Sequence, residues 1–161
     1  MQIPSLLERT RIPIRIDVGF GDVVKPQVRE QKLPTLLDFP APKIRTYPPE
    51  TVIAEKFQAL VDLGMTNSRL KDFYDLHFLI KNFEFENEIL TEAVKATFER
   101  RKTEIPKRMP IALTEEFSSD TDKNRQWKAF LRRTNMSEDL GLEDVVKTLN
   151  EFFGQLLRLT K

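Results

Sequence analysis

The sequence predicts an α+β, mostly helical fold, in which a short β segment at the N-terminus precedes a bundle of about five helices. Between Arg11 and Val18, isoleucine and valine alternate with proline, arginine and aspartate, which is the period-two pattern of a half-buried strand. From Pro48 onward, apolar residues recur instead at helical spacing. We therefore expect a β-sheet remnant with a proline-rich connection over residues 1–46 and a helical domain over residues 47–161.

Turn-forming residues divide the N-terminal part. Gly19 and Gly21 mark a turn after the strand, and a short second strand is plausible over residues 22–24. Four prolines keep residues 25–43 extended, and residues 43–47 suit one further short strand.

Capping and breaking residues divide the helical part. Two prolines suit the first turn of a helix that Gly64 ends, and Ser68 is a good N-cap for the next helix. The apolar pattern predicts further helices over residues 86–102, 120–133 and 141–159, with a helical turn around residues 113–117. His77 and Trp127 fall on apolar stripes, so we interpret both as core or boundary residues rather than as functional ones.

Composition excludes several kinds of site. The 161 residues include no cysteine and one histidine, which excludes a disulfide framework, a thiolate zinc site and a histidine cluster. A metal would have to be held by carboxylates, which favours magnesium. No apolar run suggests a membrane span or a signal peptide, so we expect a cytoplasmic protein without a membrane partner.

The segment from Tyr47 to Leu79 holds the best candidates for chemistry. Lys56 lies near the edge of one apolar stripe, from which its ammonium could reach a phosphate. Asp72 and Asp75 lie at i and i+3 on the next helix, so they repel each other unless a cation lies between them. An ordinary explanation also suffices, because acids suit a helix N-terminus, Lys71 can pair with Asp75, and most lysines lie at the surface.

Two weaker candidates lie outside this segment. Asp17 would project a carboxylate from a rigid strand, although the pattern alone favours an exposed position on the solvent face. A basic run could contact RNA, which we treat as a secondary hypothesis. The alternative is that these cations lie at a helix end and complement the helix dipole. The run contains Arg100, Arg101, Lys102, Lys107 and Arg108.

Several motifs together resemble the nucleotidyltransferases of the AbiEii/AbiGii toxin family, within the polymerase-β-like superfamily. The resemblance rests on IRIDVGFGDVV, on the run DFPAPKIRTYPPETVIAEKFQALVDLG and on NSRLKDFYDL, with support from ATFERRKTEIP and QWKAFLRR. It covers nearly the whole chain and corresponds to the C-terminal two-thirds of the family's proteins.

The resemblance implies a role for each candidate. Asp17 matches the third metal-binding carboxylate, and Lys56 matches a lysine that contacts nucleotide phosphates. Asp72 and Asp75 match the acids of the last catalytic motif, with Asp72 pairing with the lysine or assisting the acceptor. Arg69 and Lys71 are further candidates for phosphate contact. In the superfamily, magnesium ions align a nucleoside triphosphate (NTP) for attack by an RNA or protein acceptor.

The sequence also departs from the family. It has neither the glycine-rich first motif nor an Asp-x-Asp pair beside a predicted strand. We therefore expect a truncated gene product or a cloned fragment with negligible transfer activity of its own. A strand without sheet neighbours would favour a homo-oligomer formed through the segment from Ile12 to Val18. The alternative to an enzyme fragment is a non-enzymatic helical module that binds a partner protein, such as an antitoxin, or RNA.

Overall fold

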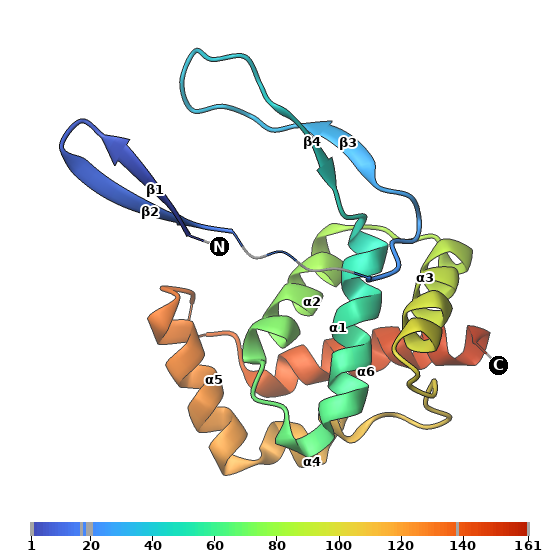
Figure 1. The fold of residues 1–161 in the computed structure, drawn as a ribbon. Coiled ribbons are helices and arrows are strands. Elements are labelled where there is room, and N and C mark those ends of the chain that lie inside the picture. Colours follow the sequence, from blue (N-terminus) through green and yellow to red (C-terminus); the bar gives the residue numbers. More distant parts are fainter. Residues whose placement is uncertain (1, 17, 19–20, 138, 161) are drawn as a thin grey trace.

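The computed structural model describes residues 2–16, 18, 21–137 and 139–160. Within these residues, two β-hairpins are followed by six α-helices and two short 3₁₀ helices (Figure 1). The α+β, mostly helical fold class is confirmed. No described helix is both long and apolar enough to cross a membrane.

The first hairpin joins β1 (Gln2–Leu7) to β2 (Thr10–Arg15) in antiparallel register, with Ile3 opposite Ile14. The sequence predicted β2 but not β1, because Pro4 and Ser5 interrupt the alternation that marks a strand. The prediction of a strand continuing to Val18 was wrong, since β2 ends at Arg15. Every residue of β2 is exposed, so its isoleucines do not face a core within this chain.

The second hairpin joins β3 (Arg29–Lys32) to β4 (Lys43–Thr46), also antiparallel. The strand expected over residues 43–47 is confirmed, whereas the strand expected over residues 22–24 is absent and those residues have no regular structure. Contacts with the helices explain this. The hydroxyl of Thr51 donates to Lys25 O at 2.7 Å and accepts from Lys25 N at 3.1 Å, which holds the segment against a helix.

Helix α1 (Pro49–Leu63) lies between α2 (Leu70–Asn82) and α3 (Asn87–Arg100), as Figure 1 shows. It ends at Gly64, whose φ of +48° is a conformation that favours glycine. The 3₁₀ helix η1 (Gly64–Thr66) then leads toward α2. These boundaries agree closely with those predicted from the sequence.

The remaining helices are η2 (Ile111–Leu113), α4 (Glu115–Ser119), α5 (Thr121–Arg133) and α6 (Leu142–Leu159). The predicted helical turn around residues 113–117 corresponds to η2 and α4. Trp127 is a core residue as expected, since its side chain is buried and Nε1 donates to Leu140 O at 2.7 Å. His77 is half-buried, as expected for a boundary residue.

Aromatic rings fix the positions of the helices. Phe57 of α1 stacks on Phe153 of α6 with ring centroids 4.1 Å apart, and it also touches Phe98 of α3. Phe73 of α2 stacks on Phe117 of α4 at 5.0 Å. All these rings are fully buried, and each contributes on the order of 2–3 kcal/mol by leaving water. The facing sides of α1 and α2 are therefore held in a fixed relation.

Candidate functional site

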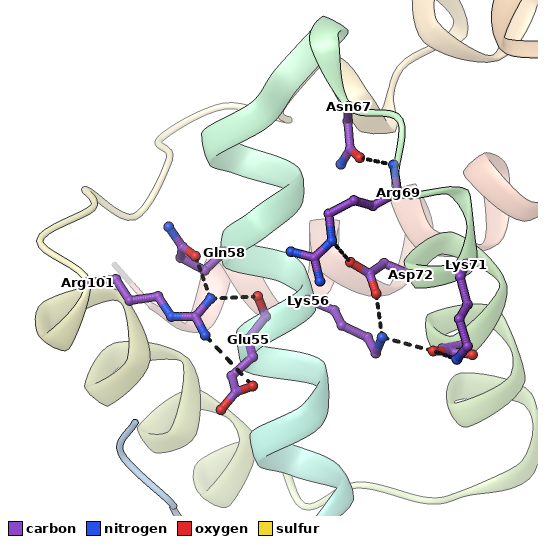
Figure 2. Close-up of polar contacts among 9 residues, drawn as sticks. Glu55, Lys56, Gln58, Asn67, Arg69, Lys71, Asp72 and Arg101 are labelled. Atoms are coloured by element: carbon purple, nitrogen blue, oxygen red, sulfur yellow. Dashed lines mark hydrogen bonds and ion pairs between the residues drawn. The ribbon is translucent and has the colours of Figure 1, made fainter. Parts of the chain in front are cut away.

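Lys56 of α1 reaches across to α2 and lies between two carboxylates (Figure 2). Its Nζ is 2.5 Å from Asp72 Oδ1 and 2.9 Å from Asp75 Oδ2. The side chains of Lys56 and Asp72 are only 18% and 6% exposed, so this is a largely buried contact. The contact between Lys56 and the two acids, which the sequence suggested, is therefore present. The functional roles assigned to these residues remain predictions.

Two further cations flank the acids from the start of α2. Arg69 Nε forms an ion pair with Asp72 Oδ2 at 2.8 Å, and Lys71 Nζ contacts Asp75 Oδ2 at 2.5 Å. We call this group the Lys56 cluster; it comprises Lys56, Arg69, Lys71, Asp72 and Asp75. Three cations against two carboxylates leave one net positive charge. The cluster therefore favours an anionic ligand.

The geometry also sets the ionisation of the cluster. Burial by itself disfavours the charged form of Lys56, but its hydrogen bonds to Asp72 and Asp75 outweigh this effect and raise the lysine's pKa. Burial would likewise raise the pKa of Asp75, but hydrogen bonds from Lys56 and Lys71 lower it overall. Asp75 is therefore a weak base at neutral pH, which suits holding a lysine better than accepting a proton.

The turn before α2 places Arg69 and Asp72. The buried side chain of Asn67 accepts a hydrogen bond from Arg69 N at 2.8 Å, and Asn67 O accepts one from Lys123 Nζ of α5 at 2.8 Å. Ser68 is exposed and is not the N-cap of α2; that position is Arg69, and no side chain caps this helix. The sequence reasoning missed Asn67 and Lys123, although an asparagine two residues before a helix is a recognisable turn signal.

A pocket of about 650 Å³ adjoins the cluster between α2 and α5. We call it the α2–α5 pocket. Arg69, Lys71 and Asp72 line it from α2, while Gln126 and Arg133 line it from α5. Its lining therefore includes three cationic side chains and one carboxylate. A phosphate group entering this pocket would meet the cations of the cluster.

A second polar group lies on the opposite side of α1 (Figure 2). Arg101 of α3 donates to Gln58 Oε1 at 2.8 Å and pairs with Glu55 at 3.7 Å and with Asp22 at 3.4 Å. We call these four residues the Arg101 clamp. Burial and then the nearby Asp22 raise the pKa of Glu55, despite the opposing effect of Arg101 and Lys56.

The neighbouring Arg100 holds the same loop, because its Nε donates to Gly21 O at 2.6 Å. Gly21 has a φ of +88°, a backbone conformation that favours glycine, and a Cβ atom there would lie 2.8 Å from Nη2 at the end of the Arg100 side chain, which would have to shift. Together with Thr51, these contacts fasten residues 21–25 onto α1 and α3. Arg100 and Arg101, two residues of the suggested RNA-binding run, are therefore already engaged in the fold.

The carboxylates that bear on the expected magnesium ion are Asp17, Asp72 and Asp75. No group of three acidic or histidine side chains comes together among the described residues. Asp72 and Asp75 are already neutralised by cations, which leaves little negative charge for a divalent ion. Asp17, the predicted metal ligand, lies outside the described residues. The only Asp-x-Asp pair in the sequence is Asp120 with Asp122. Asp120 caps α5, and Asp122 pairs with Arg125.

The described site is thus a partly buried, net-positive cluster beside a pocket lined with cations, on a helical lobe. Comparison with protein-family models matches residues 1–152 to the family described as "Nucleotidyl transferase AbiEii toxin, Type IV TA system". The chain belongs to this family. Comparisons with curated proteins and with solved structures gave no match.

The lowered pKa of Asp75 predicts a pH-dependent contribution to stability. A carboxylate whose pKa is lower in the folded than in the unfolded state stabilises the fold at pH values above the unfolded-state pKa. This stabilisation is lost as the pH falls through the folded-state pKa. Between pH 6 and pH 3, the free energy of unfolding in urea should therefore fall further in the unaltered chain than in Asp75→Asn, by up to about 1 kcal/mol, because the loss begins only below the unfolded-state pKa of an aspartate. Asp62→Asn, at an exposed position of α1, is the control and should follow the unaltered chain. Identical pH profiles for all three proteins would contradict the prediction.

The Arg101 clamp predicts local loosening when it is broken. Arg101→Met keeps an apolar stem but removes the donors to Gln58 and the charge facing Asp22 and Glu55. The amide of Lys25, which donates to Thr51, should then exchange with deuterium faster by about tenfold, equivalent to about 1.4 kcal/mol of opening free energy. Arg108→Met changes an exposed arginine in the same way and should leave this exchange unaltered. Unchanged exchange in Arg101→Met would show that the loop is held by other contacts.

Proposed function

We propose that the Lys56 cluster contacts the phosphates of an NTP in a nucleotidyl-transfer reaction. The observation that carries this proposal is the position of Lys56, which two acids of α2 hold in a largely buried place beside a pocket lined with cations. An ammonium fixed in this way is pre-oriented, so binding a phosphate costs little side-chain entropy. Membership of a nucleotidyltransferase family supports the same assignment.

In the proposed reaction, the oxygen of an acceptor hydroxyl forms a bond to the α-phosphorus, and the bond from this phosphorus to the oxygen that bridges the α- and β-phosphates breaks. Pyrophosphate leaves, and the proton of the hydroxyl passes to solvent. Lys56, Arg69 and Lys71 would offset the negative charge on the phosphates. Asp75 would hold Lys56 in place, while Asp72 would hold Lys56 and assist the acceptor. Magnesium and Asp17 belong to the expected chemistry of the family, but no step of the reaction is assigned to a metal.

The acceptor we propose is RNA or protein, and the acting toxin would be opposed by an antitoxin. The family description, which names a type IV toxin–antitoxin system, supports an antitoxin as a functional partner. A role as a non-enzymatic binding module has less support, because such a module has no need of a buried lysine held between two acids.

Nucleotide binding by Lys56 variants tests the proposed function without requiring turnover. By calorimetry with NTPs, Lys56→Gln should bind at least about tenfold more weakly than the unaltered chain, a loss of about 1.4 kcal/mol. Lys56→Arg keeps the charge and should retain part of the affinity. Lys95→Gln, at an exposed position on α3, is the matched control and should bind like the unaltered chain.

Circular dichroism should first establish that each variant is folded, since Lys56 also bridges α1 and α2. NTP binding by folded Lys56→Gln at the affinity of the unaltered chain would exclude the proposed site.

We also propose that the chain self-associates through the first hairpin. Its apolar side chains are exposed, among them Ile3, Ile12 and Ile14 at 40%, 44% and 47%. Both β1 and β2 can also accept a further strand along their outer edges. A second copy of the hairpin would cover the exposed apolar side chains and pair with an outer strand edge.

Sedimentation velocity tests this association. The unaltered chain should sediment as a dimer or larger at micromolar concentration, whereas Ile12→Thr/Ile14→Thr should sediment as a monomer, because threonine keeps the strand propensity and removes apolar surface. Phe78→Thr, an equally exposed apolar residue on α2, should remain associated. A monomeric unaltered chain would contradict this proposal.

A further inference from the structure

The exposed side of α5 carries a concentration of positive charge. Trp127, Phe130 and Leu131 face the core, and the cations occupy the opposite side of the helix. We call this side the α5 cationic face; its charged residues are Arg125, Lys128, Arg132 and Arg133. Asp122 is the single acidic residue of α5, and it pairs with Arg125 at 2.8 Å. The face therefore keeps a strong excess of positive charge.

Two of these cations are available to a ligand. Within the described part of the chain, neither Lys128 nor Arg133 has an ion-pair partner, and both are exposed. They border a surface hollow of about 600 Å³ that the cations of α5 line together with Ala129. Ala129 and Arg133 also line the α2–α5 pocket, so the two hollows adjoin each other at these residues. A ligand lying along α5 would thus reach the pocket that contains Asp72.

We propose that the α5 cationic face binds the phosphate backbone of an RNA acceptor and leads one end of that RNA into the α2–α5 pocket. This inference rests on the proposed function, since it identifies the acceptor and its path to the Lys56 cluster. From Arg125 to Arg133 the helix rises by about 12 Å. The face is therefore long enough to contact several successive phosphates of one strand.

The chemistry of the face favours nucleic acid over a protein or a membrane. Protein interfaces generally have an apolar or aromatic centre, whereas the middle of this face offers only the methyl group of Ala129. None of the large apolar side chains that are exposed in the described chain lies on α5. A membrane-binding helix would likewise need apolar residues to insert. A phosphate backbone needs only the charges that this face provides.

The α5 cationic face is a different surface from the basic run between Arg100 and Arg108. Arg100 and Arg101 of that run hold the Gly21 loop, and α3 and α5 lie on opposite sides of the helical body (Figure 1). Lys107 and Arg108 of the run are nevertheless exposed. They provide a matched control, because one lysine and one arginine can be removed from each surface.

Salt-dependent RNA binding tests the proposal without nucleotide or turnover. The probe is a fluorescein-labelled RNA hairpin with a single-stranded 3′ end, followed by fluorescence anisotropy from 50 to 300 mM KCl. Lys128→Ala/Arg133→Ala should weaken binding and reduce the slope of log K against log salt by about 2, because each of the two cations neutralises one phosphate. Lys107→Ala/Arg108→Ala should leave the slope unchanged. The weakening should be equal for hairpins of different sequence.

Three outcomes would overturn the proposal. The first is a slope of log K against log salt that changes equally in Lys128→Ala/Arg133→Ala and in Lys107→Ala/Arg108→Ala, or that changes in neither. The second is stronger binding of the unaltered chain to a polyglutamate peptide than to RNA at equal charge, which would assign the face to an acidic protein. The third is stronger binding to vesicles of phosphatidylserine and phosphatidylcholine, which would assign it to a membrane.

Crosslinking tests the path of the RNA separately. With 4-thiouridine at either end of the hairpin, one of the two RNAs should crosslink to residues 68–72 or 126–133, and crosslinks confined to other residues would exclude the proposed path. Because these measurements use no NTP, failure of RNA binding and failure of nucleotide binding at Lys56 can be told apart.

Discussion

The arrangement of the site depends on one interaction, the ammonium of Lys56 between the carboxylates of Asp72 and Asp75. The two acids lie one turn apart on α2 and would repel each other without a cation between them. Lys56 relieves this repulsion and is in turn kept charged despite its burial. Since the lysine comes from α1, the same interaction joins two helices and defines the charge of the site.

Helix α1 separates two polar groups that have different roles in the fold. On one side it presents Lys56 to α2, and on the other it presents Glu55 and Gln58 to Arg101. The Arg101 side fastens the loop that follows the first hairpin, whereas the Lys56 side borders the α2–α5 pocket. Arg133 of α5 lines this pocket together with the cations of α2. Cations therefore lie both on the exposed side of α5 and around the pocket that adjoins the cluster, and charges of one sign attract a polyanion.

The sequence by itself determined the helices, because their apolar periodicity and their breaking residues are local. It also identified Lys56, Asp72 and Asp75, since the resemblance to the AbiEii/AbiGii family rests on the short motifs that contain them. The family itself is confirmed over residues 1–152. The sequence did not indicate the pairing of β1 with β2, the role of Asn67 or the Arg101 clamp. The Arg101 clamp depends on contacts between residues far apart along the chain. The hairpin is local, but Pro4 and Ser5 interrupt its alternation, and Asn67 is a local turn signal.

Only the tertiary structure decided which charges are engaged and which are available. In the sequence, Arg101 and Arg133 are equally basic, and neither differs from an ordinary helix-end arginine. Packing places Arg101 against Asp22, Glu55 and Gln58, whereas Arg133 lines a pocket without an ion-pair partner among the described residues. The physical reason is that a charge is neutralised by neighbours in space, and those neighbours come from helices and loops that lie far apart along the chain.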